Sequence, residues 1–369
     1  MLIQRAYKTE IKPNDKQITF FRRCLGASRF VYNWALADRI ALFEQGEKTS
    51  QYTQCKKFNA VKDDVCPWIR KLPYIVVESS VANLDTAYKN FFRRVKQGKE
   101  KAGFPRFKKK GQQHSFQLKR GKITDTHIYF TGIGMVRLCQ DRYIPTDAQK
   151  YGNYLTVSTQ GGKWFVSVLV YEEVEKLETT GEVLGIDFGI KDIAILSTGK
   201  VFSNPKVLYD AEAKLKRLQR ELARRNKGGE NWQKTKAKLQ QAYYKVTCIR
   251  KHILNEISSY VVYDLKPDVI VLEDLNVSGM VKNHHLAKAI LDVGFYELRR
   301  QIEYKAEWAG IQVVFADRFF PSSKTCSRCG CVKSDLTLGD RVFVCPDCGF
   351  EIDRDLNAAI NLQKLGTVV

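Results

Sequence analysis

The chain is 369 residues long, which is enough for two or three domains with separate cores. Its 61 Lys and Arg residues exceed its 40 Asp and Glu residues, and the net charge of +21 favours a polyanionic partner, most often a nucleic acid. No apolar run approaches the ~20 residues of a membrane-spanning helix, and the charged N-terminus is unlike a secretory signal. We therefore expect no membrane association and a cytoplasmic protein.

The N-terminal part predicts one strand followed by helices. Residues 1–12 alternate enough to form a strand, which Pro13 ends. Apolar residues then recur at helical spacing from Asp15, and residues 79–94 form a second clear helix. Three arginines lie between the apolar positions of the first helix, namely Arg22, Arg23 and Arg29. A single such arginine usually belongs to a solvated face, whereas the cluster favours contact with phosphates.

A strongly basic segment follows the second helix. Nine cations stand in the eighteen residues from 93 to 110, opposed only by Glu100: Arg93, Arg94, Lys96, Lys99, Lys101, Arg106, Lys108, Lys109 and Lys110. Phe104 and Phe107 interrupt this run. A plain charge run is usually a mobile solvated loop, but interleaved aromatic rings suit phosphate contact combined with base stacking. We therefore interpret Arg93, Arg94, Arg106 and Lys108 as nucleic-acid contacts.

From residue 123 to 170 the pattern changes to short β-type runs separated by turns. Such runs predict a small barrel or sandwich. If residues 1–12 join the same sheet, the helices of 14–105 are an insertion within it. Four glutamates then break the pattern and predict a linker: Glu172, Glu173, Glu175 and Glu178.

A new domain is predicted to begin near Glu182. Residues 183–190 form a buried-type strand that Asp187 interrupts, and residues 193–196 and 199–202 return as partner strands. A basic helical hairpin follows, with Gly228 and Gly229 in its turn and its second arm over 239–262. Then come a buried strand over 269–272, a helix over about 288–309 and a strand over 311–315.

Three acids stand where apolar strands or a small-residue helix turn them inward: Asp187, Glu273 and Asp355. An isolated buried carboxylate is costly, and the cost is removed if the acids converge on divalent cations. The order of strands, helices and acids is that of a ribonuclease-H-like nuclease. Two Mg²⁺ or Mn²⁺ ions about 4 Å apart would activate a water and stabilise the leaving oxygen in phosphodiester hydrolysis. Taken singly, each acid is better explained as a strand-end or helix-cap residue, and Asp355 could be a simple N-cap.

Four cysteines near the C-terminus have the spacing of a structural zinc site. They form two Cys-x2-Cys pairs separated by fifteen residues: Cys326, Cys329, Cys345 and Cys348. Each pair can aim both sulfur atoms at one point, and a glycine follows each pair where the chain must turn. Two disulfides are the alternative, but the other six cysteines show no pattern and no secretory signal is seen. Cys331 is treated as a spare thiol.

With these residues in view, the chain resembles, nearly from end to end, the TnpB proteins of IS200/IS605-type transposons, ancestors of the Cas12 nucleases. The resemblance is carried by GASRFVYNW (26–34), YKNFFRR (88–94), FPRFK (104–108), GIDFG (185–189), VLEDLN (271–276), PSSKTC (321–326) and DRDLNAA (353–359). The last four motifs together are highly specific. On this match Asp187, Glu273 and Asp355 fall on the catalytic positions of the family, and the four cysteines fall on its zinc ligands. Asp353 does not fall on a catalytic position.

The resemblance implies an α/β multidomain fold. A RuvC/RNase H-like nuclease domain would comprise 181–317 and 350–369, with a zinc-ribbon insertion over 318–349 that binds target nucleic acid. A β-barrel wedge domain would comprise 1–13 and 106–180, with a helical recognition domain inserted over 14–105. Arg318 and Lys324 lie near the expected site in the sequence, and we expect them to contact nucleic acid.

The implied activity is that of an Mg²⁺-dependent RNA-guided DNA endonuclease. A guide RNA from the transposon end would direct cleavage of double-stranded DNA beside a short transposon-associated motif, with two Mg²⁺ ions and one structural Zn²⁺ ion bound to a monomer that holds one RNA. Base pairing would read the target while the protein holds the heteroduplex by shape and charge.

Three alternatives share this charge and chemistry. A guide-dependent, non-cleaving DNA-binding repressor would normally show a lost acid or a truncated ribbon, and neither is seen. A transposase acting on its own transposon ends would need no guide RNA. A compact Cas12-type CRISPR effector would differ only in the origin of its guide.

Overall fold

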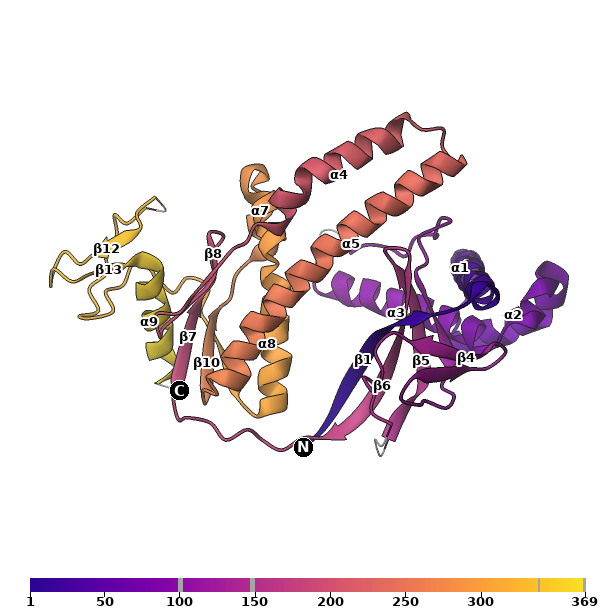
Figure 1. The fold of residues 1–369 in the computed structure, drawn as a ribbon, viewed down its shortest axis with the longest axis horizontal. Helices are drawn as coiled ribbons and strands as arrows, with labels where there is room; N and C mark the ends of the chain where they lie inside the picture. The colour runs from indigo at the N-terminus through magenta and orange to yellow at the C-terminus, as the bar shows by residue number, and fades with distance from the viewer. Residues whose placement is uncertain (99–101, 147–149, 338, 368–369) are drawn as a thin grey trace. The chain divides into compact units, whose positions relative to one another are not determined.

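The computed structural model describes residues 1–98, 102–146, 150–337 and 339–367 (Figure 1). Lys99, Glu100 and Lys101 of the basic segment lie outside the described residues. The chain divides into two units, one made of Leu2–Glu172 and the other of Met1 with Glu173–Val369. In the part of the chain that the structure describes, no helix is long and apolar enough to cross a membrane.

The first unit is built on a six-stranded sheet. Its strands are β1 (Leu2–Lys12), β2 (Ser115–Lys119), β3 (His127–Phe130), β4 (Gly134–Leu138), β5 (Lys150–Gln160) and β6 (Lys163–Glu173), in the order β2-β5-β6-β1-β4-β3. The N-terminal strand therefore joins the later strands, as expected. The linker prediction was wrong for Glu172 and Glu173, which belong to β6. Glu172 is held there by hydrogen bonding from Tyr7 and by an ion pair with Arg5 at 3.3 Å.

The sheet of the first unit is strongly curved. Phe21 is fully buried, and its ring centroid lies 5.8 Å from Phe116 on β2 and 5.6 Å from Phe130 on β3. These two strands stand at opposite ends of the strand order. In a flat sheet with strands about 4.8 Å apart, the ends would be more than 20 Å apart. Because one ring contacts both ends, the sheet curls around it.

Three α-helices lie between β1 and β2: α1 (Asp15–Glu44), α2 (Gln51–Val65) and α3 (Ile75–Lys96). Asn14 starts α1 through a reciprocal capping box with Gln17. The helix α2 was not predicted from the sequence. Its buried face consists of Gln54, Cys55 and Phe58.

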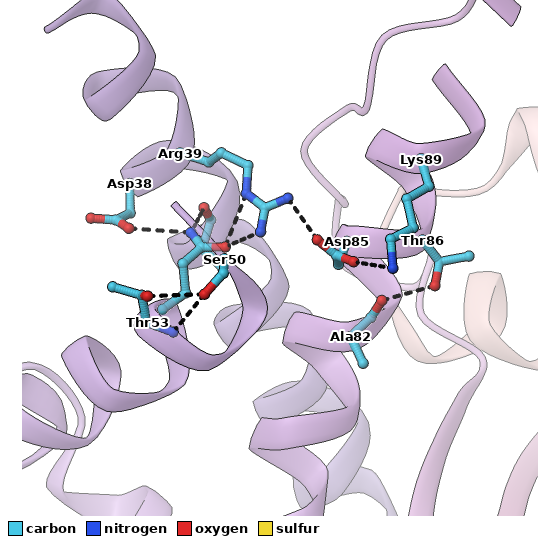
Figure 2. Close-up of polar contacts among 10 residues, drawn as sticks. Asp38, Arg39, Ser50, Thr53, Ala82, Asp85, Thr86 and Lys89 are labelled. Carbon is cyan, nitrogen blue, oxygen red and sulfur yellow. Dashed lines mark hydrogen bonds and ion pairs between the residues drawn. The ribbon is translucent and has the colours of Figure 1, made fainter. Parts of the chain in front are cut away.

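Arg39 ties the three helices together (Figure 2). From α1 its guanidinium donates to Gln54 on α2 at 3.0 Å and to Asp85 on α3 at 3.2 Å. Gln54 in turn donates to Asp38 at 3.2 Å, and Lys89 pairs with Asp85 at 2.9 Å. The helical part of this unit is therefore fixed by polar contacts as well as by its apolar core.

The second unit holds a five-stranded sheet of β7 (Val183–Asp187), β8 (Asp192–Leu196), β9 (Val201–Ser203), β10 (Val269–Glu273) and β11 (Gln312–Ala316). The order is β11-β10-β7-β8-β9, with β7, β10 and β11 parallel and β8 antiparallel to both β7 and β9. Every strand predicted from the sequence in this region is confirmed.

Helices cover both faces of this sheet (Figure 1). On one face, α5 (Glu230–Ser259), α7 (His284–Val293) and α8 (Phe295–Ala309) bury alternate strand residues such as Ile186 and Ile270. On the other face, Leu362 of α9 (Arg354–Gly366) packs on Val271 and Val183. Because strand residues alternate, Asp187 and Glu273 lie on the α9 face with Val183 and Val271.

Two helix predictions need correction. The second arm of the basic hairpin, α5, begins at Glu230 rather than 239, after α4 (Val207–Arg224). The helix predicted over about 288–309 is two helices, because Gly294 between α7 and α8 adopts a left-handed conformation with φ of 76°.

A small ribbon separates β11 from α9. It contains β12 (Val342–Val344) and β13 (Glu351–Asp353), which pair antiparallel. Phe343 is fully buried among Cys326, Cys345 and Leu336, so the ribbon has a core of its own.

Candidate active site and metal centre

Asp187 and Glu273 are the last residues of two adjacent parallel strands, β7 and β10. β7 and β10 pair with Val269 opposite Val183 and Leu272 opposite Ile186, which places Glu273 level with Asp187. Both carboxylates therefore leave the same edge of the sheet on the same face, at the carboxyl ends of the strands.

The third acid, Asp355, is brought to this edge by the close approach of α9 to β7. Gly185 has no side chain, and a Cβ there would lie 2.0 Å from the carbonyl oxygen of Ala359 and 2.4 Å from the amide nitrogen of Gln363. The helix backbone thus packs directly on the strand, and Gln363 donates to the carbonyl of Val183 at 2.8 Å. Asp355 lies in the first turn of this helix.

The three carboxylates affect one another. Burial raises the pKa of Asp187 well above its usual value, and the charges of Glu273 and Asp355 raise it further. Burial also raises the pKa of Glu273, against a hydrogen bond from the Ser322 hydroxyl at 2.6 Å that lowers it. Like charges held close together at a poorly solvated edge of the sheet favour the binding of cations there.

Asp355 is already paired with arginine. Arg354 donates to its Oδ1 at 2.8 Å from Nε and 2.7 Å from Nη2, and Arg341 lies 3.6 Å from its Oδ2. The N-cap of α9 is Asp353, which accepts from the backbone of Asp355 and Leu356 at 3.0 Å each. Asp355 is therefore not the cap, and its carboxylate is held by side chains instead.

The three acids do not lie as close together as ligands around a bound ion. Among the described residues, the one group of at least three His, Cys, Asp or Glu ligand atoms within 4.8 Å of one another is the four cysteines. The carboxylates still fit divalent cations in type, since they are oxygen donors around a buried, negatively charged edge. To share an ion, Asp355 would have to turn from Arg354 toward Asp187.

The four cysteine sulfurs form a tetrahedral-type cluster. The Sγ atoms of Cys326 and Cys348 are 3.8 Å apart, and those of Cys329 and Cys345 are 3.5 Å apart. Four sulfurs about 2.3 Å from a central zinc would be separated by about 3.8 Å. Backbone N–H donation from Cys348 helps to hold the pKa of Cys345 at about 6, so it favours the thiolate that a metal needs. All ten cysteines are free in this structure, and the four sulfurs meet at one point as a metal site requires.

Two buried asparagines fix the beginning of the ribbon to α9. Asn357 accepts from the amide of Ser327 at 2.9 Å and donates to the carbonyl of Thr325 at 2.7 Å. Asn361 donates to the carbonyls of Ser322 at 2.8 Å and Thr325 at 2.6 Å. The segment that supports Glu273 through Ser322 is therefore held by the helix that carries Asp355. Neither asparagine was selected from the sequence, although both stand in the small-residue pattern of α9.

A cavity of about 270 Å³ opens beside Glu273. Arg299 and Arg318 line it, and both pair with Asp274, at 2.9 and 2.6 Å. Tyr296 at its edge is 71% exposed. The cavity thus combines one of the three acids, Glu273, with two cations and an aromatic ring, which suits a phosphodiester and its base.

The other cations selected from the sequence lie in several places. Arg22, Arg23, Arg93, Arg94 and Arg106 are exposed, and Arg29 is half-buried. Lys108 is half-buried over the ring of Tyr32, 3.9 Å from its centroid, and burial lowers its pKa. Lys324 donates to the carbonyl of Ser334 at 3.0 Å.

Comparison with known proteins gives matches along nearly the whole chain. Family descriptions match in three places: "Helix-turn-helix domain" over residues 1–48, "Probable transposase" over 165–284 and "Cas12f1-like, TNB domain" over 295–362. The chain is 32% identical over 389 residues to "Putative RNA-guided DNA endonuclease InsQ" of Escherichia coli (strain K12), covering 99% of this chain and 93% of that protein. The chain belongs to the TnpB family.

Two further matches place this TnpB-family protein among its relatives. A "Putative RNA-guided DNA endonuclease" of Streptomyces pristinaespiralis is also 32% identical, over 99% of this chain and 90% of that protein. The fold is similar to that of the solved "mini-RNA-guided endonuclease CRISPR-Cas_phi3", with a TM-score of 0.51, 9% identity and coverage of 100% and 92% of the two chains. An α/β multidomain fold shared with this effector is therefore established.

Proposed function

We propose that this TnpB-family protein is an RNA-guided DNA endonuclease that hydrolyses DNA at Asp187, Glu273 and Asp355. The observation that carries the proposal is the placement of these three acids at one edge of the sheet by β7, β10 and α9. Burial raises the pKa of Asp187, and the charges of the other two acids raise it further. Relatives named as RNA-guided DNA endonucleases, similar over almost the entire chain, support the same conclusion.

The second unit is a RuvC/RNase H-like nuclease domain in this proposal. Support comes from its strand order, in which an antiparallel β7-β8-β9 meander is extended by the parallel strands β10 and β11. It would comprise 181–317 and 350–369, around a zinc ribbon expected over 318–349, to which β13 (Glu351–Asp353) is joined by its pairing with β12. The curvature around Phe21 supports a barrel-like wedge domain over 1–13 and 106–180, the sheet of which lies in the first unit up to Glu172, with the helices of 14–105 as the recognition domain.

Asp187, Glu273 and Asp355 would hold Mg²⁺, which activates the attacking water and stabilises the leaving oxygen when bound. Ser322 orients Glu273 through its hydrogen bond, and Asp274 positions Arg318 at the rim. Arg299 and Arg318 there would hold the phosphates that flank the scissile bond. The four cysteines would hold one structural zinc ion.

The partners are a guide RNA from the transposon end and double-stranded target DNA. The net charge of +21 supports binding to both. The proposed backbone contacts are Arg22, Arg23, Arg29, Arg93, Arg94, Arg106, Lys108, Arg318 and Lys324. Most are exposed, as phosphate contacts need to be.

The decisive experiment replaces Asp187 with asparagine in the ribonucleoprotein. We expect cleavage of guide-matched DNA in Mg²⁺ to fall by at least about a thousandfold, because several kcal/mol of metal-derived stabilisation are lost. Guide and target binding should be unchanged. Without Mg²⁺ the variant should also melt a few degrees higher, because the charged form of Asp187, which burial and the neighbouring Glu273 disfavour, is gone.

Asp268→Asn is the matched control. Asp268 stands exposed just before the other end of β10, where it accepts from Gly181 at 3.0 Å, and an amide oxygen can still accept there. It should cleave normally. Undiminished cutting by Asp187→Asn would reject the site, and binding without cutting by the unaltered protein would favour a non-cleaving DNA-binding protein.

A further inference from the structure

A second cavity, in the first unit, is unrelated to the acids. Its volume is about 460 Å³, within the range of about 300–1,000 Å³ common for small-ligand sites. It is lined by Arg23, Gly26, Arg29, Phe30, Trp68, Lys71 and Leu72. We call it the Trp68 cavity.

The indole of Trp68 is presented on a rigid turn. It belongs to η1 (Pro67–Lys71), a 3-10 helix that follows α2 and starts with proline. On either side of it along the chain, Cys66 and Ile69 are buried in the core. The ring meets Phe30 of α1 edge-on, with centroids 5.7 Å apart and planes at 71°. Yet Trp68 is 47% exposed, so a large aromatic surface is held in place without being covered.

Three cations line the cavity together with this ring. Arg23 and Arg29 come from α1 and Lys71 from η1. In the described ranges, no carboxylate lies within ion-pair distance of any of them, and they make no side-chain hydrogen bond there. The adjacent Arg70, by contrast, is not among the lining residues and pairs with Asp63. The positive charge of the cavity is therefore available to an external anion.

Gly26 lines the cavity and contributes no side chain to it. This residue stands between the two arginines on α1, and a Cβ there would meet no heavy atom of the described residues within 4 Å apart from those of its own stretch of helix. A planar ligand can thus approach the helix between Arg23 and Arg29 while it rests against the indole.

We propose that the Trp68 cavity binds one unpaired or terminal nucleotide of a nucleic-acid strand. Its base would stack on Trp68, and its flanking phosphates would pair with Arg23, Arg29 and Lys71. An exposed aromatic ring among unpaired cations is the combination that binds single-stranded nucleic acid, since every base has a face to stack and every linkage a charge. The inference rests on the proposed function, and the strand belongs either to the guide RNA or to the DNA.

Photo-crosslinking of the wild-type ribonucleoprotein identifies the strand. One sample carries 5-iodouridine in the guide RNA, and the other carries 5-iododeoxyuridine in the target DNA. We expect one of them to crosslink to the tryptic peptide 63–70, which contains Trp68. In both the RNA and the DNA, the iodinated base is placed at every position in turn. Absence of this crosslink from all of these samples would overturn the proposal.

Binding assays test the energetics. Trp68→Ala should weaken binding of the crosslinked strand by about five- to hundredfold, whereas Trp68→Phe should stay within about threefold because a ring remains. Arg29→Ala should lower the slope of log affinity against log salt by about one. The controls are Arg70→Ala and Phe43→Ala, whose side chains lie outside the cavity, and both should bind normally.

These results separate the two proposals. If the unaltered protein does not cut guide-matched DNA, the proposed function fails while the crosslink still reports on the cavity. If it cuts, and Trp68→Ala is folded and binds both strands like the wild type, the cavity proposal alone is rejected. The crosslink needs no variant, so it decides the case even where Trp68→Ala does not fold.

Discussion

Replacing Gly185 with alanine tests whether the contact of α9 with β7 builds the active site. The new Cβ would lie 2.0 Å from the Ala359 carbonyl oxygen, and α9 would have to withdraw by about 1.4 Å to reach ordinary contact at 3.4 Å. The obstacle is backbone, which cannot rotate away as a side chain can. We therefore expect the upper end of the cost of overpacking, about 3 kcal/mol in the free energy of unfolding.

The same displacement should impair catalysis, because Asp355 moves with the helix. A misplacement of about 1 Å can reduce the rate about a hundredfold. We would measure unfolding in urea and single-turnover cleavage at saturating Mg²⁺. Gly366→Ala is an informative comparison, since its Cβ would meet methyl groups of Val183 and Val271 at 2.6 Å, and these can shift. It should lose less stability and less activity.

Gly26→Ala serves as the control for the substitution itself. No heavy atom lies within 4 Å of its added Cβ, and alanine favours helix, so the free energy of unfolding should rise by up to about 1 kcal/mol. If Gly185→Ala unfolds within about 0.5 kcal/mol of the wild type and cleaves at the normal rate, the reasoning about this contact is wrong.

Three further predictions follow from single side chains. Cys345→Ser should release zinc and unfold the ribbon, measured by metal analysis and limited proteolysis, and a full zinc content would contradict it. Ser322→Ala should raise the Mg²⁺ concentration for half-maximal cleavage about tenfold, because Glu273 loses its hydrogen bond, whereas Ser323→Ala should not. Lys305 is buried in α8 and bonded to Asn255, Ser258 and Ser259, and burial lowers its pKa to about 8. Between pH 8 and about 10.5 the unfolded state keeps a proton that the folded state has lost, so the stability of the wild type should rise with pH in this window, by about 3 kcal/mol at most. Lys305→Met should abolish that rise in pH-dependent urea unfolding, and an identical pH profile would contradict the assignment.

The sequence was sufficient where a pattern is local. Short apolar runs before Asp187 and Glu273 predicted the buried strands that end in these acids, and the cysteine spacing predicted the sulfur cluster. Both signals depend only on residues that are close together in the sequence.

Features that depend on distant contacts could not be found this way. Arg341, which precedes β12, reaches Asp355 through the folding of the ribbon, and no spacing in the sequence indicates that pair. The break at Gly294 was missed because apolar residues continue at helical spacing on both sides of it. The helix α2 was missed because its buried face contains Gln54, whose amide contacts Ala35, Asp38 and Arg39 in place of an apolar core residue.

The attachment of the ribbon to α9 has an evolutionary consequence. Asn357 and Asn361 hold residues 322–327, and β13 leads without a break into the helix, so both ends of the ribbon are anchored at one place. Between these anchors the inserted ribbon has its own core and its own cluster of four cysteines. Its outer loops can therefore change in length and composition, or be exchanged between homologues, while the cleavage chemistry is inherited intact.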